Sequence, residues 1–214
     1  MPKLYGAPAS PFVRKVLVAL AEKGIAYEHE NVIPVNVSAE YKKISPLGKI
    51  PAYQDGDLTL PDSSVIIAYL EKVKPTPSLY PTDTKDYARA LWFEEYGDGG
   101  LSPLVGPKVF FQKIVGPRLF KQPTDEAVVR KAVDEELPPM FDYLESHLGA
   151  GGWLVGGQFS VADIGVPTQL AQLTLAGEAP DAKRWPKLAA YLDRVFARPS
   201  FKDAIGKSKA MLGL

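Results

Sequence analysis

The chain has 214 residues, of which 46% are hydrophobic and 23% charged, a composition typical of a globular protein. Lys and Arg together number 25, as do Asp and Glu, so the formal net charge is zero. This balance, with no basic run, lacks the electrostatic footprint of a protein that binds nucleic acid. A chain of this length forms one large domain or two small ones and buries about 70% of its unfolded surface.

The sequence contains no cysteine, which excludes disulfides, thiolate metal sites and a cysteine nucleophile. Any thiol chemistry must therefore use a thiol on the ligand. His29 and His147 lie far apart in the sequence, and neither has a partner at metal-ligand spacing, so we expect neither a metal site nor a hydrolase triad. The first five residues lack a signal-peptide core, and no apolar run is long enough to cross a bilayer. We expect a cytosolic protein with no membrane partner.

The first 75 residues alternate strand and helix signals. The expected elements, in chain order, are strand 3–5, helix 11–23, strand 27–32, helix 39–44, a hairpin over 52–60 and helix 64–74. The apolar residues of the first helix recur at helical spacing, and Lys23-Gly24 ends it. The first strand–helix–strand unit is expected to be parallel and right-handed.

A stiff linker separates this part from the rest, because Pro75-Thr76-Pro77 and Pro81-Thr82-Asp83 restrict the chain. The sequence beyond it favours helices throughout. The expected helices are 83–96, which loosens at Gly97–Gly100, 124–147 with a kink at Pro138-Pro139, 161–176, 187–197 and 201–211, with a loop over 149–152.

Two segments of the second half have distinct local signals. Ser160 and Asp163 form a capping box, with Phe159 packing on Ile164 as a staple, which explains folding rather than chemistry. The stretch containing Phe110-Phe111 is interrupted by Gly-Pro pairs on both sides, which favours a lid-like crossing over the site rather than a regular helix.

The hairpin segment has the features of a binding site. Ile50-Pro51 precedes its first strand, and a proline there is a candidate cis peptide that turns backbone groups of Ile50 toward a peptide-like ligand. Asp62-Ser63 follows the second strand at a helix entrance, where a hydroxyl and unpaired N–H groups suit a carboxylate. Asp62 suits an ammonium group. A ligand with an amine and a carboxylate at one end and a peptide bond in its middle satisfies these groups.

Together these residues resemble the cytosolic glutathione S-transferases, of serine type and similar to bacterial or tau and phi members. The resemblance covers nearly the whole chain and rests on five motifs in the correct order. They are Leu4-Tyr5 to Ser10-Pro11-Phe12-Val13-Arg14-Lys15-Val16, Ser45 to Pro51, Pro61 to Leu70, Trp153 to Asp163, and Ala197 to Phe201.

The resemblance implies a thioredoxin-like glutathione-binding domain at 1–78, a linker at 79–86, and an all-helical domain at 87–214 that contains the electrophile pocket. It also implies a homodimer and a reaction in which the thiolate of glutathione, the co-substrate, attacks an electrophile. It supports the cis peptide before Pro51. The chain departs from the family at Asp62, where Glu is commoner.

The resemblance makes Ser10 the catalytic candidate, at the position of the thiol-contacting hydroxyl. The alternative is a simple N-cap, because Ser-Pro is a favoured helix start. Tyr5 is the rival hydroxyl, and its alternative is a core aromatic. Lys49, Ile50, Pro51, Asp62 and Ser63 are the residues expected to bind glutathione. For Lys49 a solvated loop charge, and for the Asp62-Ser63 pair a helix cap, remain the alternatives.

Phe12, Leu104, Phe110 and Phe111 are candidates for an apolar pocket that holds the electrophile, although such aromatics more often belong to a core. The predicted function is conjugation of glutathione to an apolar electrophile, with reduction of hydroperoxides as a further reaction of the same thiolate. The alternative is a related binding or assembly module without turnover. A thiol-disulfide oxidoreductase is disfavoured because cysteine is missing.

Overall fold

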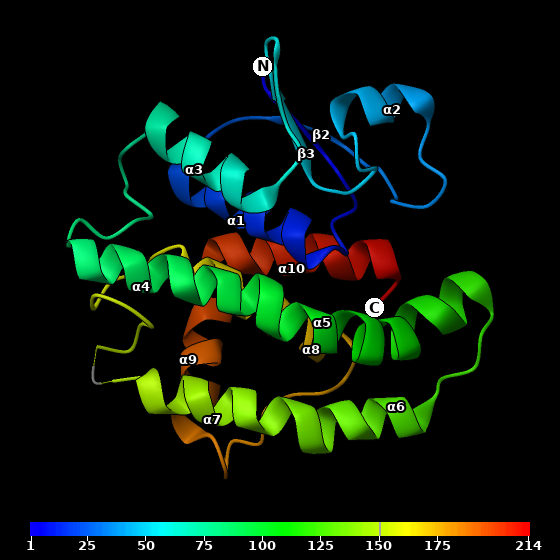
Figure 1. The fold of residues 1–214 in the computed structure, drawn as a ribbon, viewed down its shortest axis with the longest axis vertical. Helices are drawn as coiled ribbons and strands as arrows, with labels where there is room; N and C mark the ends of the chain where they lie inside the picture. Colours follow the sequence, from blue (N-terminus) through cyan, green and yellow to red (C-terminus); the bar gives the residue numbers. More distant parts are fainter. Residues whose placement is uncertain (150) are drawn as a thin grey trace. The chain divides into compact units, whose positions relative to one another are not determined.

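The computed structural model describes residues 1–149 and 151–214, and their contacts divide into two compact units. Unit 1 comprises Met1–Leu79 with Pro199–Leu214, and unit 2 comprises Tyr80–Arg198. The expected all-helical domain at 87–214 differs from this division in its last helix, α10 (Pro199–Leu212), which packs on α1 (Pro11–Lys23) of unit 1 (Figure 1).

Unit 1 is built on a four-stranded sheet in the order β2-β1-β3-β4. β1 pairs with β2 in parallel, and both the β1–β3 and the β3–β4 pairs are antiparallel, which confirms the thioredoxin-like fold class. The remaining elements before the linker are β1 (Lys3–Tyr5), β2 (Glu28–Glu30), α2 (Ala39–Ile44), β3 (Ala52–Asp55), β4 (Leu58–Leu60) and α3 (Ser63–Val73).

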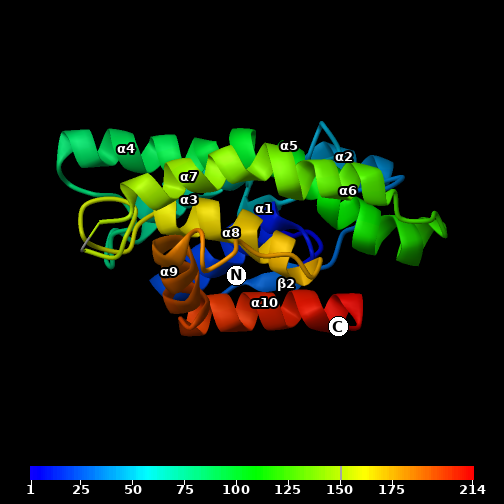
Figure 2. The same ribbon diagram turned by 90° about the horizontal axis from the view of Figure 1, so that it is seen from below.

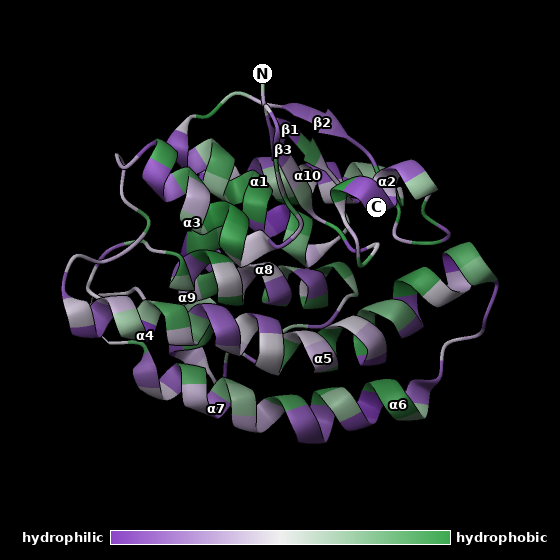
Figure 3. Ribbon diagram, turned by 45° about the horizontal axis from the view of Figure 1, so that its top comes forward, coloured by the Kyte–Doolittle hydropathy of each residue, from purple (hydrophilic) through white to green (hydrophobic). Residues whose placement is uncertain are grey.

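The strand expected over 27–32 is shorter in the structure, where β2 spans only Glu28–Glu30. Its one neighbour in the sheet is β1, which has only three residues, so the ladder stops where β1 stops. All three β2 side chains are exposed, and Figure 3 shows this edge as hydrophilic. Charged edge strands of this kind discourage pairing with other chains.

Helix α1 follows from its sequence. Ser10 caps it and Pro11 occupies the first position, where the missing N–H costs nothing. Gly24 ends it in the left-handed conformation, with φ of 57°, as the Lys23-Gly24 signal predicts. The buried apolar side chains of α1, all of them at most 2% exposed, include Val13, Val16, Leu17 and Leu20.

Unit 2 consists of helices, several of which widen into π-helical turns. Its elements are α4 (Thr84–Glu95), η1 (Tyr96–Leu101), α5 (Ser102–Leu104), η2 (Val105–Phe120), α6 (Glu126–Lys131), η3 (Ala132–Glu136), α7 (Leu137–His147), α8 (Ala162–Leu175) and α9 (Pro186–Phe196). The predicted loosening at 97–100 is therefore a π-helical segment, and the helix expected over 124–147 is three consecutive segments.

The segment around Phe110-Phe111, expected to be a lid-like crossing rather than a regular helix, is a continuous π-helix, because η2 spans Val105–Phe120 without a break. The glycines and prolines of this segment do not end the helix but accompany a change to the wider π-helical turn. A proline cannot donate the regular i→i−4 hydrogen bond, and π-helical turns are one way in which a helix continues past such a gap.

Helix α8 is the centre of unit 2, because every one of its residues except Thr174 is buried. It packs against α4, η1, η2 and α9 (Figure 2). The crossing with η1 is close because it joins two glycines: a Cβ at Gly97 would lie 2.9 Å from the carbonyl carbon of Gly165. Larger residues at either position would separate the helices.

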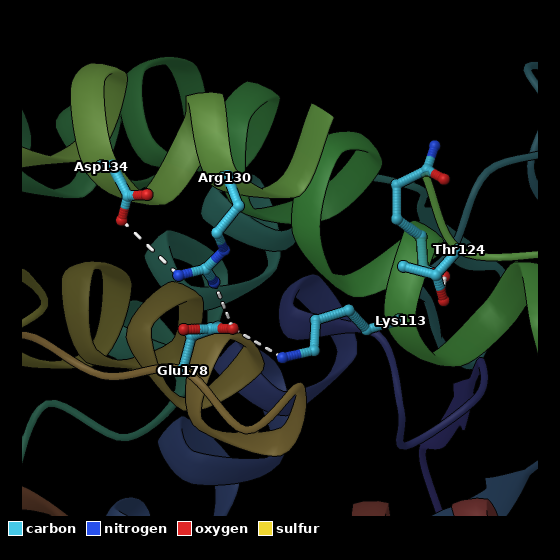
Figure 4. Close-up of polar contacts among 6 residues, drawn as sticks. Lys113, Thr124, Arg130, Asp134 and Glu178 are labelled. Atoms are coloured by element: carbon cyan, nitrogen blue, oxygen red, sulfur yellow. Dashed lines mark hydrogen bonds and ion pairs between the residues drawn. The ribbon is translucent and has the colours of Figure 1, made fainter. Parts of the chain in front are cut away.

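An ion cluster connects η2, α6 and the turn after α8 (Figure 4). Lys113 Nζ and Arg130 Nη2 each lie 2.6 Å from Glu178 Oε1. Burial opposes ionisation of Glu178, but these two cations hold the pKa of its carboxyl below the ordinary value. Thr124 Oγ1 donates to the carbonyl of Gln112 at 3.0 Å and so closes the chain between η2 and α6.

The predicted capping box is present only in part. Asp163 accepts a hydrogen bond from the Ser160 N–H at 2.9 Å, as expected, but the Ser160 hydroxyl also points to this carboxylate, at 3.3 Å, instead of capping α8. The Leu154 N–H and the Tyr191 hydroxyl also donate to Asp163, at 3.0 and 2.9 Å. Asp163 is thus a fully buried carboxylate that fixes the preceding loop and α9 to α8.

Burial raises the pKa of Asp163 from 3.8 to about 6, although its hydrogen bonds oppose this shift. The folded state therefore holds this proton more tightly than the unfolded state. The resulting stabilisation is complete below about pH 4 and is lost as the pH rises through 6.

We expect the unfolding free energy of the wild type, relative to Asp163→Asn, to fall by about 2–3 kcal/mol between pH 4 and pH 7. Urea titrations of both proteins at one-unit pH steps measure this difference. The Asn variant will be less stable at every pH because it cannot accept all four hydrogen bonds, so only the slope tests the shift. A difference that is constant with pH, or that grows, contradicts the raised pKa.

Candidate active site

The sheet brings three predicted site segments to one edge. β1 ends at Tyr5, which lies opposite Ala52 at the start of β3, and β4 ends at Leu60, opposite Tyr53. The segment before Ser10, the Ile50-Pro51 peptide and Asp62-Ser63 therefore all leave the sheet at the same end, as the hairpin and α1 in Figure 1 illustrate. Ser10 and Ser63, which are 53 positions apart in the sequence, thus follow strands that end on the same side of the sheet.

Gly6 is the residue that allows these segments to approach, and the sequence analysis missed it. Its φ is 142°, and a Cβ there would lie 2.5 Å from Val13 Cγ2, 3.2 Å from Ile50 Cβ and 3.6 Å from Pro51 Cα. Only glycine adopts this backbone conformation and fits this space. A glycine directly after a strand and shortly before a helix cap was the available signal.

Ser10 is the N-cap of α1, as its alternative interpretation predicts. Its Oγ accepts a hydrogen bond from the Val13 N–H at 3.5 Å, which is long and therefore weak. The Ser10 hydroxyl proton has no acceptor within residues 1–149 and 151–214. The cap uses an oxygen lone pair, so a half-buried O–H donor remains for a ligand at the helix N-terminus.

Tyr5 already has a partner. Its hydroxyl donates to Gln54 Oε1 at 2.8 Å, and its ring lies 6.1 Å from that of Tyr41 in a small core cluster. Only 6% of Tyr5 is exposed. The structure therefore places Tyr5 as a core aromatic.

The peptide bond between Ile50 and Pro51 is cis, as expected. Across the part of the chain that the structure describes, the Ile50 N–H and C=O make no hydrogen bond. The preceding carbonyl, of Lys49, accepts hydrogen bonds from the Tyr41 and Ser45 hydroxyls, both at 2.8 Å. This loop is thus fixed on one side and presents unused backbone groups next to Pro51.

The side chain of Lys49 is exposed and forms no ion pair with another described residue. Both of its interpretations, a ligand contact and a solvated charge, are compatible with this placement. Its position beside Ile50 keeps a positive charge at the same edge of the sheet.

Asp62 and Ser63 have different roles at the start of α3. Asp62 caps the helix by accepting from the Ser64 and Val65 N–H groups, both at 3.0 Å. Ser63 is only 4% exposed, yet its hydroxyl has no hydrogen-bond partner among the described residues. Directly behind it, Lys15 Nζ donates to Ser64 Oγ at 2.7 Å and connects α1 to α3. The cap needs only Asp62, so Ser63 is left for another function.

The candidate pocket residues belong to different units. Phe12 is half-buried in unit 1, whereas the other three belong to unit 2. Phe110 is 6% exposed and part of the core of unit 2, which corresponds to its alternative interpretation. Leu104 is half-buried at the end of α5, and Phe111 is half-buried with its ring 6.0 Å from that of Phe120.

Within residues 1–149 and 151–214, no three His, Asp or Glu side chains are grouped as metal ligands. No helix in these ranges is long and apolar enough to cross a membrane.

Comparison with known proteins identifies the family. The profile of the glutathione S-transferase N-terminal domain matches residues 4–78, and that of the C-terminal domain matches 110–207. The chain is 32% identical to glutathione S-transferase 3 of Zea mays, over 95% of the chain and 92% of that protein.

Two solved structures have the same fold. A glutathione S-transferase from Rhodospirillum rubrum F11 has a TM-score of 0.87 at 27% identity, covering 95% of this chain and 91% of that one. Glutathione S-transferase-I bound with lactoylglutathione has a TM-score of 0.86 at 25% identity, covering 96% and 99%. The chain belongs to the glutathione S-transferase family, which confirms the family and the transferase class predicted from the sequence.

We expect Gly6→Ala to lower the unfolding free energy by about 2–4 kcal/mol, because it combines a strained φ with contacts to three segments. It will also displace Ile50 from Val13 and lower the affinity for glutathione. Gly56→Ala is the matched control: Gly56 also has a positive φ, of 61°, but nothing lies within 4 Å of its Cβ position. It will cost about 1 kcal/mol and leave binding unchanged.

Denaturant titration and calorimetry with glutathione measure these effects. Equal losses of stability and unchanged binding in both variants would disprove the close approach at Gly6.

Proposed function

We propose that this glutathione transferase uses the Ser10 hydroxyl to hold glutathione as a thiolate, which then attacks an apolar electrophile. The observation that carries the proposal is the hydroxyl proton of Ser10. It has no acceptor among the described residues, although its oxygen already caps α1. Family membership supports glutathione as the thiol substrate.

The magnitudes are sufficient without a general base. A free thiol has a pKa near ~8.5, so only about 3% is ionised at neutral pH. Lowering this pKa by about two units needs roughly 2.7 kcal/mol. One hydroxyl donor to an anion contributes about 1.5–3 kcal/mol, and the N-terminus of α1 adds about 0.3–1 kcal/mol. The further acceleration comes from holding the electrophile beside the sulfur.

The remainder of glutathione would occupy the other groups at this edge of the sheet. The Ile50 N–H and C=O, next to Pro51, would pair with the backbone of its cysteine residue. The hydroxyl and N–H of Ser63, at the start of α3, would receive the γ-glutamyl carboxylate, and Asp62 its ammonium. Lys49 would contact the distal carboxylate. The support for this set is that the donors of Ile50 and Ser63 are unused among the described residues.

The electrophile in this proposal is an apolar compound, for which Leu104 and Phe111 are half-buried candidates in unit 2 and Phe12 is one in unit 1. The same thiolate would also reduce organic hydroperoxides. A glutathione transferase that resembles this chain in fold is bound with lactoylglutathione, a conjugate of glutathione, which supports a site that accepts an extended thiol substituent.

A cytosolic homodimer completes the proposal. Its support, apart from the family, is a set of apolar side chains on α4 that are at least 38% exposed, namely Tyr87, Leu91 and Trp92. Exposed apolar groups on one helix are typical of a surface that another chain covers.

Ser10→Ala is expected to lower turnover at least tenfold, because the thiolate loses its donor. The absorbance of bound thiolate near 240 nm, followed against pH, will show a raised pKa of the bound thiol. Tyr5→Phe is the control: it removes a hydroxyl that is committed to Gln54, so turnover will stay within about threefold of the wild type. The opposite ranking of the two variants would overturn the assignment of Ser10.

Ser63→Ala is expected to weaken glutathione binding about tenfold or more, with a smaller effect on the pKa of the bound thiol, because it removes a donor to the γ-glutamyl end. Calorimetry measures the affinity. Ser64→Ala is the neighbouring control, since the Ser64 hydroxyl accepts from Lys15 within the protein. If Ser63→Ala binds glutathione like the wild type, the γ-glutamyl end lies elsewhere.

A further inference from the structure

Segment Gly6–Ala9 precedes Ser10, and each of its four carbonyl oxygens lies within hydrogen-bond distance of a donor. The Gly6 carbonyl lies 2.9 Å from His29 Nε2, and the Ala7 carbonyl accepts from the Ser10 N–H at 2.9 Å. The Pro8 carbonyl accepts from the Ser208 hydroxyl at 2.7 Å, and the Ala9 carbonyl lies 3.4 Å from Arg14 Nη2. The chain before Ser10 is therefore fixed peptide by peptide.

Two of these contacts come from a single buried pair. Arg14 on α1 and Ser208 on α10 are both 0% exposed. Arg14 Nε and Nη2 donate to Ser208 Oγ at 3.2 and 3.1 Å, so the oxygen of Ser208 is an acceptor and its proton is free to donate. That proton has two acceptors in reach, the carbonyls of Pro8 at 2.7 Å and of Ala204 at 2.9 Å. The guanidinium thus occupies the oxygen of Ser208 and leaves its proton for these carbonyls, of which that of Pro8 is the nearer.

We propose that Ser208 and Arg14 are positioning residues for the thiolate, and that helix α10 acts on catalysis through them. The inference rests on the proposed role of Ser10. Neither residue touches glutathione in this proposal. Their task is to keep the Pro8 and Ala9 carbonyls away from the sulfur and the Ser10 hydroxyl in line with it.

The physical reason is the sign of the peptide dipole. If the Pro8 or Ala9 peptide turned over, a carbonyl oxygen with its negative partial charge would face the thiolate in place of donors, and the thiol pKa would rise. The Pro8 and Ala9 peptides lie in a turn outside regular secondary structure, so their carbonyls are oriented by Ser208 and Arg14 rather than by a helix or a sheet. Small displacements of a donor have large effects on rate, since catalysis depends on aligned groups.

Helix α10 itself provides a matched control. Ser200 lies in the first turn of α10, is 7% exposed and donates to Glu22 Oε1, at the opposite end of α1 from Ser10. Ser200→Ala removes one partly buried hydrogen bond between α10 and α1, whereas Ser208→Ala removes the contacts of α10 with Arg14 and with the Pro8 carbonyl. Only Ser208 reaches the segment before Ser10.

The test compares these variants in the full-length protein, with glutathione and a standard apolar electrophile such as 1-chloro-2,4-dinitrobenzene. For Ser208→Ala we expect kcat to fall about five- to tenfold with KM for glutathione within about twofold. The pKa of the bound thiol, from thiolate absorbance, will rise by about 0.7–1 unit, which is the same factor. Ser208→Thr keeps the hydroxyl and will restore both values. Ser200→Ala will lose stability and leave kcat and the thiol pKa unchanged.

If Ser208→Ala merely loses stability, with kcat and thiol pKa as in Ser200→Ala, the inference is overturned. Arg14→Met provides a second measurement, with the same expected shift of the thiol pKa in whatever fraction folds. The Ser10→Ala background separates the two proposals. There Ser208→Ala will cause a smaller change, because only the carbonyl dipole is left to act on the sulfur; an equal change in both backgrounds contradicts the inference alone, whereas wild-type turnover in Ser10→Ala itself contradicts the proposed function.

Discussion

The candidate site depends on one close approach, that of the Gly6 backbone to Val13 and to the Ile50-Pro51 peptide. The antiparallel pairing of Tyr5 with Ala52 places Gly6 beside the Ile50-Pro51 peptide at the same end of the two strands. Because Gly6 has no side chain, the two backbones can lie in contact. A Cβ at this position would displace the start of α1 from the cis-proline loop. In the proposed site, the donors of Ser10 and Ile50 can face a common ligand only while this contact is present.

The polar groups at this edge divide into those that hold the protein together and those that are left over. Asp62, Tyr41, Ser45 and Lys15 are committed to caps and loops. Ser63 and the backbone of Ile50 are not, within the described residues. A group that the fold does not use can bind a ligand directly, whereas a committed group would first have to give up a hydrogen bond within the protein. The unused groups therefore indicate a ligand site better than the committed ones.

In unit 2, two carboxylates near α8 show how burial and hydrogen-bond or charge partners compete to set a pKa. The Asp163 carboxylate accepts four hydrogen bonds and is nevertheless easier to protonate than a free one, since burial outweighs its donors. The ion cluster of Glu178 with Lys113 and Arg130 remains partly exposed, and there the cations prevail over burial and lower the pKa. The two carboxylates differ because solvent reaches one of them and because only that one has cationic partners.

The sequence by itself determined the local elements and the family. Ser10-Pro11 marks the start of α1 and Lys23-Gly24 its end, and the Asp-Gly turn joins the two strands of the hairpin. Five motifs in the correct order identify a glutathione transferase. These depend on neighbours in the chain, so local patterns suffice. Tertiary structure alone decided that Gly6 is the contact point, that Ser208 reaches Pro8, that Tyr5 is already paired and that η2 stays helical past its prolines. The first three depend on groups brought together from distant positions in the chain. The fourth depends on a change of helical turn that residue propensities do not encode. Contacts and turns of this kind leave no periodic signal in the sequence.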